Sequence, residues 1–360
     1  MEDRGSRLRE KLLGWYREGK RDLPWRRTRD PYAILVAEFL LQRTRIATGL
    51  PYYERFLARF PTVQDLAAAS ESDVLRVWEG LGFYGRARKL HEAAKMIVAR
   101  HGGAVPADLE ALQALPGVGP YTAGAVGSIA FGLRAPALDG NARRVIARLR
   151  WSRVKSRAGS ELETIARELV PADSPGEWNQ ALMDLGATVC VPRRPRCTVC
   201  PVSDECDAFA EGVQDRVPPR RRSRPIPTTA VMFALVEDHG RILLVQRPSD
   251  GLLAGLWSLP GGEAGTASGL RGLVREQTGL DINPRAAVAK VDHTFSHRRW
   301  SGRVVRARVR GGRLRGGRWF RREDLASVAL VPFHRRVVIH VSPAGFPPLD
   351  SPRRAARTVR

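Results

Sequence analysis

Hydrophobic positions recur at helical spacing over the first part of the chain. The segment 86–100 carries apolar residues on one helical face, namely Leu90, Ala94, Ile97 and Val98. The segment 70–80 starts with Ser70, continues with acidic residues and ends at Gly80, which is typical of a capped helix. Short Gly/Pro turns separate such segments. The pattern therefore predicts a multi-helix, all-α domain.

The last third of the chain has a different pattern. The segments 230–237 and 241–246 are rich in apolar and β-branched residues and flank a turn at 238–240, so we expect a β-hairpin. The segment 303–310 alternates basic and apolar residues like a strand, and 333–340 predicts a final helix. A small α+β domain follows from these elements.

The length of 360 residues is enough for about two domains. We expect a helical domain over residues 8–210 and an α+β domain over 229–345. The segment 211–228 is rich in Pro and Arg, as linkers are, and 346–360 reads as a basic tail. The predicted fold class is therefore multidomain, all-α and then α+β, and we find no internal repeat.

Charge narrows the choice of partner. The chain has 60 Lys and Arg against 37 Asp and Glu, a formal net charge of +23. Such a surplus favours binding to a polyanion, most simply nucleic acid. Genomic base composition could explain Arg in place of Lys, but it does not explain the excess over acidic residues. No apolar run reaches the length of a membrane-spanning helix.

All four cysteines of the chain fall in one short segment, as Cys190-x6-Cys197-x2-Cys200-x5-Cys206. Two disulfides are one possibility, but residues 1–20 are charged and amphipathic rather than a secretory signal, which disfavours them. Zinc sites built from four cysteines usually have two CxxC pairs, and only one is present here. A [4Fe–4S] cluster also takes four thiolates. A metal or cluster site is therefore expected.

The segment 115–125 (LPGVGPYTAGA) predicts a tight turn between two helices. Gly117 and Gly119 allow close backbone approach, so N–H groups at the start of the second helix can face an anion. An ordinary helix–helix turn is the alternative. The segment resembles the helix-hairpin-helix of DNA glycosylases, which implies that it binds one backbone phosphate without reading sequence.

Two more segments extend this resemblance. Residues 137–144 (ALDGNARR) resemble the catalytic aspartate motif of the same superfamily, although a lone Asp before Gly is usually only a turn. The segment 190–206 resembles the cluster loop of endonuclease III and its relatives in spacing and position. That likeness implies a [4Fe–4S] cofactor held by all four cysteines and favours it over zinc.

The residue after Gly119-Pro120 decides the chemistry in this superfamily. Bifunctional members have a Lys there, whose amine attacks the sugar and forms a Schiff base. This chain has Tyr121, and it has no Lys between Lys95 and Lys155. The sequence therefore favours a monofunctional glycosylase.

Three segments resemble MutY-type adenine DNA glycosylases: 23–32 (LPWRRTRDPY), 37–44 (AEFLLQRT) and 78–88 (WEGLGFYGRAR). The resemblance implies that Glu38 is a general acid that protonates adenine N7 and so makes the base a better leaving group. Such an acid must be protonated near neutral pH, which requires burial that raises its pKa. The apolar residues 39–41 beside it agree with this expectation.

The same resemblance implies roles for further residues. Asp139 would stabilise the oxocarbenium-like sugar, electrostatically or through a transient covalent bond. Tyr121 and Asn141 would help to position these groups. Trp25 and Arg26 would line the pocket of the flipped adenine, with ordinary packing and a surface charge as the alternative. Flipping is needed because the duplex shields the glycosidic bond.

The C-terminal part resembles a Nudix-like domain. The segment 251–263 (GLLAGLWSLPGGE) matches the start of such a domain, whereas 271–280 (RGLVREQTGL) lacks most of the carboxylates that a Nudix box uses to bind Mg²⁺. We therefore expect no pyrophosphohydrolase activity.

A segment after the degenerate Nudix box resembles the loop with which MutY-type enzymes recognise 8-oxoguanine. This segment, 293–300 (HTFSHRRW), includes Phe295, Ser296 and His297. A hydroxyl such as that of Ser296 can hydrogen-bond the altered Hoogsteen edge of the lesion. The alternative is a polar β-turn.

On the helical side, the resemblance implies that Gln42, Arg43, Thr44 and Leu81 also contact the duplex near the lesion. The chain departs from the family at Arg43, where a second Gln usually inserts into the duplex. Arg can stack and hydrogen-bond as well, but it could alter the choice of opposite base. Three basic residues of the cysteine loop are candidates for DNA contacts: Arg193, Arg194 and Arg196.

These motifs together predict a monofunctional glycosylase that removes adenine opposite 8-oxoguanine, or opposite guanine, from double-stranded DNA. One alternative is a related enzyme for thymine in G·T mismatches; another is a catalytically inactive lesion-binding protein, against which Glu38 and Asp139 argue. We expect a monomer with no membrane association. The localisation expected is the bacterial cytoplasm, with activity at the nucleoid.

Overall fold

The computed structural model describes residues 4–154, 160–219 and 225–340. The chain divides into two compact units. Unit 1 comprises Met1–Val77 and Gly85–Arg222, and unit 2 comprises Trp78–Tyr84 and Ser223–Arg360. The tail predicted at 346–360 lies outside the described residues. Within the described ranges, no helix is both long and apolar enough to cross a membrane.

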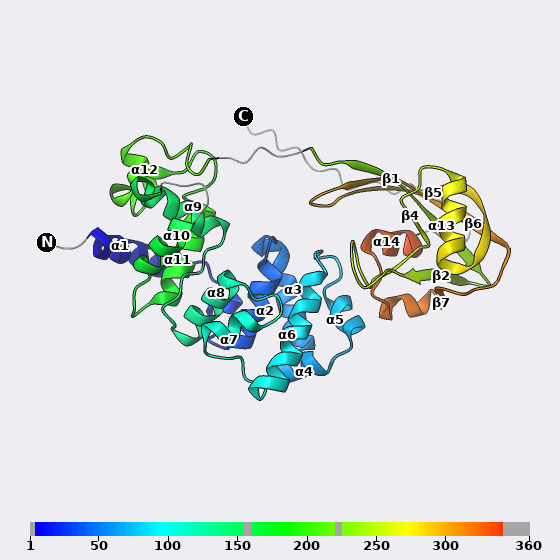
Figure 1. Ribbon diagram of the computed structural model, residues 1–360, viewed down its shortest axis with the longest axis horizontal. Coiled ribbons are helices and arrows are strands. Elements are labelled where there is room, and N and C mark those ends of the chain that lie inside the picture. Colours follow the sequence, from blue (N-terminus) through cyan, green and yellow to red (C-terminus); the bar gives the residue numbers. More distant parts are fainter. Residues whose placement is uncertain (1–3, 155–159, 220–224, 341–360) are drawn as a thin grey trace. The chain divides into compact units, whose positions relative to one another are not determined.

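Unit 1 is helical (Figure 1). Its α-helices are α1 (Arg4–Gly19), α2 (Pro31–Leu41), α3 (Ile46–Arg59), α4 (Val63–Ala68), α5 (Glu71–Val77), α6 (Gly85–His101), α7 (Leu109–Ala114), α8 (Pro120–Phe131), α9 (Gly140–Leu149), α10 (Ser160–Leu169), α11 (Pro175–Thr188) and α12 (Asp207–Ala210). Short 3₁₀ turns are η1 (Pro24–Arg26), η2 (Trp151–Arg153), η3 (Cys197–Val199) and η4 (Ser203–Glu205).

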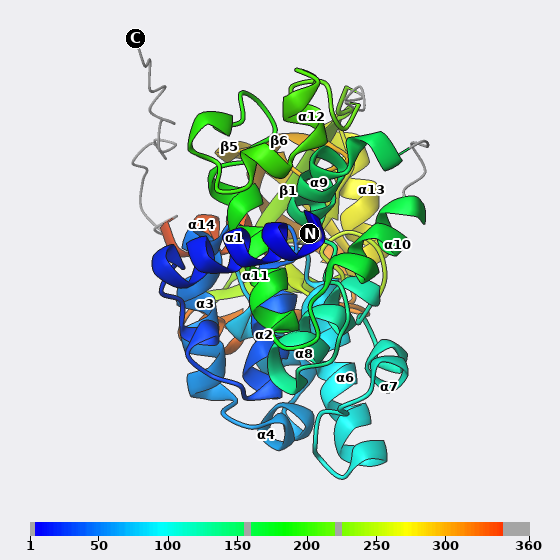
Figure 2. The same ribbon diagram turned by 90° about the vertical axis from the view of Figure 1, so that its left-hand side faces the viewer.

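Helix α11 is the central element of one half of unit 1. It packs against α1, α8 and α9, and α1 lies across it in Figure 2. The hydrophobic core here draws on α1, α9, α10 and α11, with buried residues Leu8, Leu12, Val145, Ile146, Ile165, Ala166, Trp178 and Leu182. Three of the four cysteines pack against this core. The cysteine loop is thus part of the folded body of unit 1.

Helix α2 is buried along nearly its whole length. Asp30 caps its first turn by accepting a 2.9 Å hydrogen bond from the Tyr32 N–H, and Pro31 suits the first helical position. Every residue from Tyr32 to Leu40 is buried. A helix that is apolar on all faces must lie inside the domain, so any carboxylate on it is desolvated.

The helix predictions are confirmed with one exception. Segment 70–80 contains α5 and segment 86–100 lies within α6. The Ser70 hydroxyl accepts from the Asp73 N–H at 3.1 Å as an N-cap. Val98 was expected on the buried face of α6, but it is 38% exposed. At about 100° per residue, Val98 lies about 80° around the helix from Leu90, at the edge of the apolar face.

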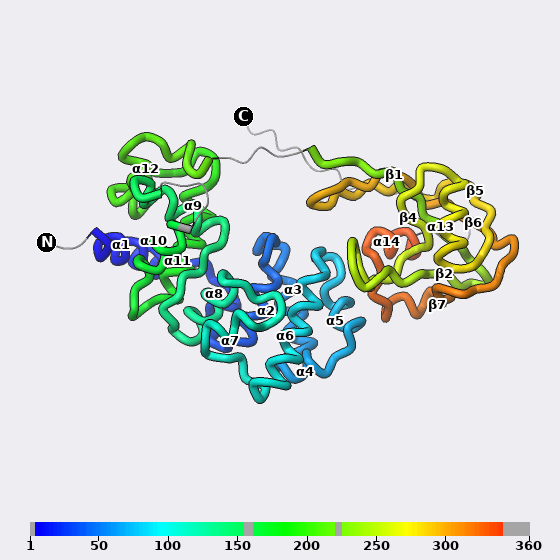
Figure 3. The backbone as a smooth tube through the Cα atoms, in the orientation of Figure 1, coloured from blue at the N-terminus to red at the C-terminus, as the bar shows by residue number. Residues whose placement is uncertain are grey.

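Unit 2 contains a mixed β-sheet with strand order β3-β2-β1-β6-β5. Its strands are β1 (Thr228–Asp238), β2 (Arg241–Gln246), β3 (Trp257–Ser258), β4 (Gly261–Gly262), β5 (Leu280–Thr294), β6 (Arg299–Gly312) and β7 (Arg318–Arg321). Strand β1 runs parallel to β6, whereas β5 and β6 form the long antiparallel hairpin visible in Figure 3. Helix α13 (Ala267–Thr278) covers one face of the sheet through Leu270 and Val274.

The strand predictions are confirmed. Segments 230–237, 241–246 and 303–310 lie in β1, β2 and β6, and α14 (Pro332–His340) contains the predicted last helix. The β1–β2 turn places His239 and Gly240 at φ 45° and 74°. Two successive residues with positive φ match the twist of a two-residue hairpin.

Candidate active site

Glu38 lies on α2 and meets Tyr121 at the start of α8. Glu38 is 8% exposed, and burial is the main reason that its pKa rises from 4.5 to about 7. The negative charge of Asp139 raises the pKa further, while a hydrogen bond from Tyr121 and the positive charge of Arg26 lower it. A carboxyl group with a pKa near neutrality can act as a general acid at physiological pH.

Asp139 is the N-cap of α9. Its Oδ1 accepts from the Ala142 N–H at 2.6 Å, and its Oδ2 accepts from Asn141 Nδ2 at 3.0 Å. Burial raises the pKa of Asp139, and these hydrogen bonds oppose that rise because they favour the anion. The cap therefore holds a partly desolvated carboxylate near Glu38 in one orientation.

The chain leading into Asp139 is fixed by a buried amide. Asn179 of α11 is 1% exposed and accepts from the Ala137 N–H at 2.9 Å. Its Nδ2 donates to the Ser128 hydroxyl and to the Ala135 carbonyl, both at 2.8 Å. This side chain connects α8, α11 and the Asp139 loop, so it positions both walls of the site.

Arg26 forms a buried ion pair with Asp184. Its Nη1 and Nη2 lie 2.7 and 2.8 Å from the two Asp184 oxygens, and the side chains are 8% and 4% exposed. The positive charge of Arg26 lowers the pKa of Glu38, so Arg26 lies close to the candidate site. Trp25 is 8% exposed and packs edge-on against Tyr53 at 5.1 Å between ring centroids.

The predicted hairpin joins α7 to α8. Gly117 has φ 79°, and a Cβ there would lie 2.9 Å from Phe39 and 2.7 Å from Lys89. Glycine is needed at this position for both reasons. Gly119 has an ordinary φ of −93° and open space around it, and as the N-cap of α8 it leaves the first N–H groups without a side-chain cap. Those groups remain able to bind an anion.

The residues predicted to read the lesion fall in both units. Gln42, Arg43 and Thr44 follow α2 in unit 1; Arg43 is exposed, and Gln42 Nε2 donates to the Thr122 hydroxyl at 3.3 Å. Leu81 belongs to unit 2 and is only 9% exposed, whereas Phe83 near it is 44% exposed.

The turn between β5 and β6 presents Ser296 and His297 to solvent. The Phe295 N–H donates to the Arg298 carbonyl at 2.8 Å, which closes the turn. Phe295 itself is half-buried, with its ring 5.1 Å from that of Trp300. Arg298 pairs with Glu263 at 2.5 Å. Phe295 therefore supports the turn, while Ser296 and His297 are available for contact.

Gln277 occupies the degenerate Nudix segment on α13. Its Oε1 accepts from the Gly261 N–H at 2.8 Å, and its Nε2 donates to the Gly261 carbonyl at 3.0 Å. Both polar atoms of the amide are thus used inside the fold. A neutral amide bound in this way cannot replace a carboxylate ligand of Mg²⁺.

The four cysteines border one cavity, together with Arg148. All four lie within the described residues and none is in a disulfide. Burial raises the pKa of Cys200 to about 12, so a thiolate there needs compensating positive charge. Within the described ranges, no three His, Cys, Asp or Glu side chains form a group that could hold one metal ion. Four thiols that border one cavity are the type of donor set that a [4Fe–4S] cluster uses.

Two arginines of α9 connect the cysteine loop to the rest of the site. Arg148 is 2% exposed, and its Nη1 lies 3.2 Å from Cys190 Sγ. Arg144 Nε donates to the Cys190 carbonyl at 2.8 Å, and its Nη2 donates to Asn141 Oδ1 at 3.0 Å. Hydrogen bonds therefore run continuously from Cys190 through Arg144 and Asn141 to Asp139.

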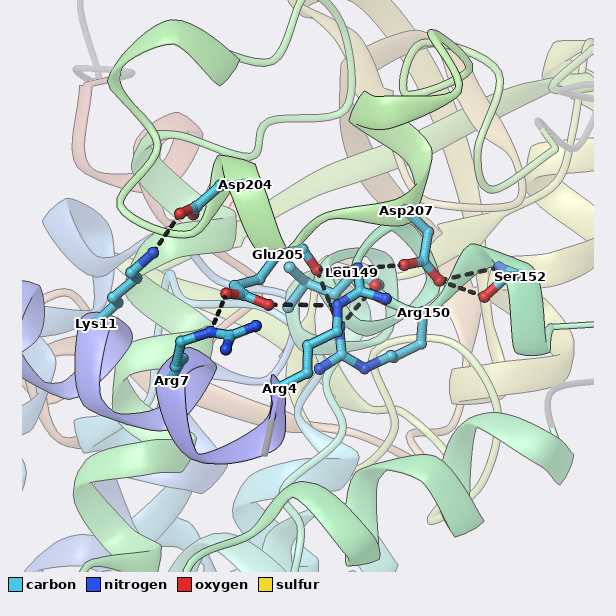
Figure 4. Close-up of polar contacts among 9 residues, drawn as sticks. All are labelled: Arg4, Arg7, Lys11, Leu149, Arg150, Ser152, Asp204, Glu205 and Asp207. Carbon is cyan, nitrogen blue, oxygen red and sulfur yellow. Dashed lines mark hydrogen bonds and ion pairs between the residues drawn. The ribbon is translucent and has the colours of Figure 1, made fainter. Parts of the chain in front are cut away.

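Helix α1 holds the other end of the cysteine loop (Figure 4). Arg4 and Arg7 pair with Glu205 at 3.3 and 3.1 Å, and Arg4 also reaches Asp207 at 2.6 Å. Arg150 Nη1 donates to the Glu205 carbonyl at 3.0 Å. The two carboxylate side chains are each 6% exposed, so these contacts satisfy charges that the loop buries.

Comparison with known proteins agrees with this geometry. Residues 36–172 match the family model of the HhH-GPD superfamily base excision DNA repair protein, and 231–340 match that of the NUDIX domain. The rat "Adenine DNA glycosylase" is 36% identical over 92% of this chain and 77% of its own length. The chain belongs to the adenine DNA glycosylase family. This confirms the resemblance drawn from the motifs and the two-part fold.

Other known proteins are similar to this chain over a smaller share of its length. The "Adenine DNA glycosylase" of Mycobacterium tuberculosis is 43% identical over 66% of this chain and 78% of its own length. Among solved structures, a thermostable thymine-DNA glycosylase superposes with a TM-score of 0.54 and 33% identity, covering 58% of this chain and 97% of that one. An endonuclease III–DNA complex, at 24% identity and a TM-score of 0.51 over 59% of this chain and 100% of that one, shows the shared fold.

Sequence reasoning missed several buried polar residues of this adenine DNA glycosylase family member. They are Asp184, Asn179 and Arg148. Each lies on a helix without a distinctive motif around it, so only its burial and partners reveal it. Arg86, which is half-buried, lies within the 78–88 motif, but its contacts with the end of α2 are visible only in the structure. A lone Asp within the apolar run of α11 was the one available signal for Asp184.

Proposed function

We propose that this chain is a monofunctional glycosylase that excises adenine opposite 8-oxoguanine, and more slowly opposite guanine, from double-stranded DNA. The observation that carries the proposal is the buried Glu38, with its pKa near 7, beside Tyr121 and Asp139. Membership of the adenine DNA glycosylase family supports the same reaction.

In this mechanism Glu38 protonates N7 of a flipped adenine. Protonation weakens the glycosidic bond, because the base then leaves as a neutral species. The carboxylate of Asp139 stabilises the positive charge that develops on the sugar, and Asn141 keeps its Oδ2 oriented. Water then completes hydrolysis. Tyr121 donates a hydrogen bond to Glu38 and offers no amine for a Schiff base.

The opposite base would be read by the β5–β6 turn. Ser296 and His297 are exposed there, and a hydroxyl can accept from the N7–H that 8-oxoguanine has and guanine lacks. In unit 1, Gln42, Arg43 and Thr44 would contact the duplex on the lesion side. Backbone phosphates would bind the α8 N-terminus beside Gly117 and Gly119.

A [4Fe–4S] cluster is the proposed cofactor, held by Cys190, Cys197, Cys200 and Cys206. When bound, it would supply a rigid charged centre that fixes the loop. The same loop has three exposed arginines that would bind DNA phosphates: Arg193, Arg194 and Arg196. A colourless protein with stoichiometric zinc would contradict this assignment.

The likeness to a thymine-DNA glycosylase keeps thymine excision from G·T pairs as the second candidate. Thymine has no N7, so protonation by Glu38 would not assist its departure. This difference between the two bases favours adenine as the substrate. The excision rates of adenine and thymine are therefore the quantities to compare.

The test is single-turnover excision from three duplexes: adenine opposite 8-oxoguanine, adenine opposite guanine, and thymine opposite guanine. We expect adenine loss, fastest opposite 8-oxoguanine, with strand breaks only after alkali. Glu38→Gln should abolish excision and keep binding to the lesion duplex. Thymine loss, or turnover by Glu38→Gln, would overturn the proposal.

A further inference from the structure

The guanidinium of Arg86 lies at the C-terminal end of α2. Its Nη1 donates to the carbonyls of Phe39 at 3.0 Å and Leu40 at 2.9 Å, and also to that of Gln42. Both Nη1 and Nη2 lie 3.2 Å from the Thr44 hydroxyl. The last carbonyls of a helix have no partner within the helix, so Arg86 both satisfies them and complements the negative end of the helix dipole.

These acceptors surround a residue in an unusual conformation. Arg43 has φ 60°, in the left-handed region that a non-glycine residue adopts at a cost of about 1–3 kcal/mol. The residues on either side of it, Gln42 and Thr44, both bind Arg86. Arg86 therefore holds the ends of a three-residue turn whose middle residue is strained.

Two further contacts limit the freedom of this turn. The Gln42 amide donates to the Thr122 hydroxyl, next to Tyr121 on α8. Burial lowers the pKa of Arg86 to about 10, and the positive charge of Arg43 adds to this effect. Like charges repel, so this interaction disfavours any arrangement of the turn that brings the Arg43 guanidinium closer to Arg86.

We propose that Arg86 is a positioning residue that determines opposite-base specificity, because it fixes the Gln42–Thr44 turn and thereby the direction of Arg43. The inference rests on the proposed function. Lys is a poorer residue at this position, since it keeps the charge but lacks the second nitrogen, Nη2, that also reaches the Thr44 hydroxyl.

A double-mutant cycle separates positioning from general destabilisation. The quantity measured is the ratio of single-turnover excision rates for adenine opposite 8-oxoguanine and opposite guanine, at saturating enzyme. We expect Arg43→Gln to change this ratio in the wild-type background. In the Arg86→Ala variant this ratio should fall about tenfold. Adding Arg43→Gln to that variant should then change the ratio little, because mutations of coupled residues are not additive.

Arg88→Ala is the matched control. Arg88 lies on the same helix, and its Nε pairs with Glu71 at 2.7 Å. With Arg88→Ala, the effect of Arg43→Gln on the ratio should remain the same as in wild type.

Chemical rescue is a further test. Guanidinium chloride below its denaturing concentration should restore the excision-rate ratio of the Arg86→Ala variant, whereas an equal concentration of sodium chloride should not. Arg86→Lys keeps the charge but not the second nitrogen, so it should lower the ratio less than Arg86→Ala does. It serves as the test if the alanine variant does not fold.

The outcomes are distinct. Additive effects of Arg43→Gln and Arg86→Ala, or equal losses of both excision rates with an unchanged ratio, would overturn the role of Arg86 in specificity. A wild-type protein that excises adenine without preferring 8-oxoguanine would instead contradict the proposed function itself.

Discussion

Tyr121 at the start of α8 hydrogen-bonds Glu38 on α2 and thereby lowers the pKa of a carboxyl group that burial raises. Burial and the neighbouring carboxylate raise the pKa of Tyr121 well above 10, so its hydroxyl stays protonated and donates. The balance leaves Glu38 with a pKa of about 7. The acid strength of Glu38 thus depends on its burial and, against that, on a contact between two helices.

The first prediction concerns pH. Glu38 must be protonated to act as an acid, so the single-turnover rate should be highest below about pH 7 and fall tenfold per pH unit above it. Tyr121→Phe removes the hydrogen bond that lowers the Glu38 pKa, so this descending limb should move to higher pH. A pH–rate profile with an unchanged limb would argue that another group titrates.

The second prediction concerns the buried ion pair. Asp184→Asn should lower the free energy of unfolding by about 3–5 kcal/mol, because it leaves the buried Arg26 charge without its carboxylate. Asp173→Asn, at an exposed position near the start of the same helix, should change it by less than about 0.5 kcal/mol. Denaturant titration of both variants measures the difference, and similar losses would refute it.

The third prediction tests the hydrogen bonds from Cys190 to Asp139. Arg144→Lys should slow excision by about 100-fold, because Asn141 loses its 3.0 Å contact and a small displacement of reacting groups is costly. Arg143→Lys is the control, since the Arg143 side chain pairs with Glu163 at the surface. Single-turnover rates and visible absorbance would be compared. Equal rates for the two variants would show that Arg144 is dispensable.

The fourth prediction concerns the α1 contacts in Figure 4. The double change Arg4→Met and Arg7→Met leaves the Glu205 carboxylate, 6% exposed, without either cation. Because both arginines are about half exposed, we expect a loss of about 1–2 kcal/mol, between exposed and buried pairs. Arg17→Met on the same helix should cost less than about 0.5 kcal/mol. Faster amide hydrogen exchange in the cysteine loop should accompany the loss only in the double variant.

The fifth prediction is that the protein with Mg²⁺ does not hydrolyse nucleoside triphosphates. The Gln277 amide is used entirely in its two bonds to Gly261, and most of the acids of a Nudix box are absent from 271–280. Pyrophosphate release above the rate of a heat-inactivated sample would contradict this expectation.

Sequence patterns predicted several secondary-structure elements. Hydrophobic period, caps and glycines located α5, α6 and the β1–β2 hairpin, because these signals are local. The acidic residues of the site lie elsewhere, on α2 and at the start of α9. Val98 shows the limit of the method: the pattern fixed the helix, but not how far around it the buried face extends. Phe295 shows another limit, since the local pattern did not indicate that its ring packs against Trp300.

Residue types and their spacing determined the family, the candidate acid Glu38, the absence of a lysine after the hairpin and the four-cysteine set. Tertiary structure alone decided what surrounds them: that Asp184 neutralises Arg26, that Arg144 joins Cys190 to Asn141, and that Arg86 holds both sides of Arg43. The physical reason is that motifs record local geometry. Burial and pairing between residues far apart in sequence, which set the pKa values and orientations of the site, exist only after the helices have packed.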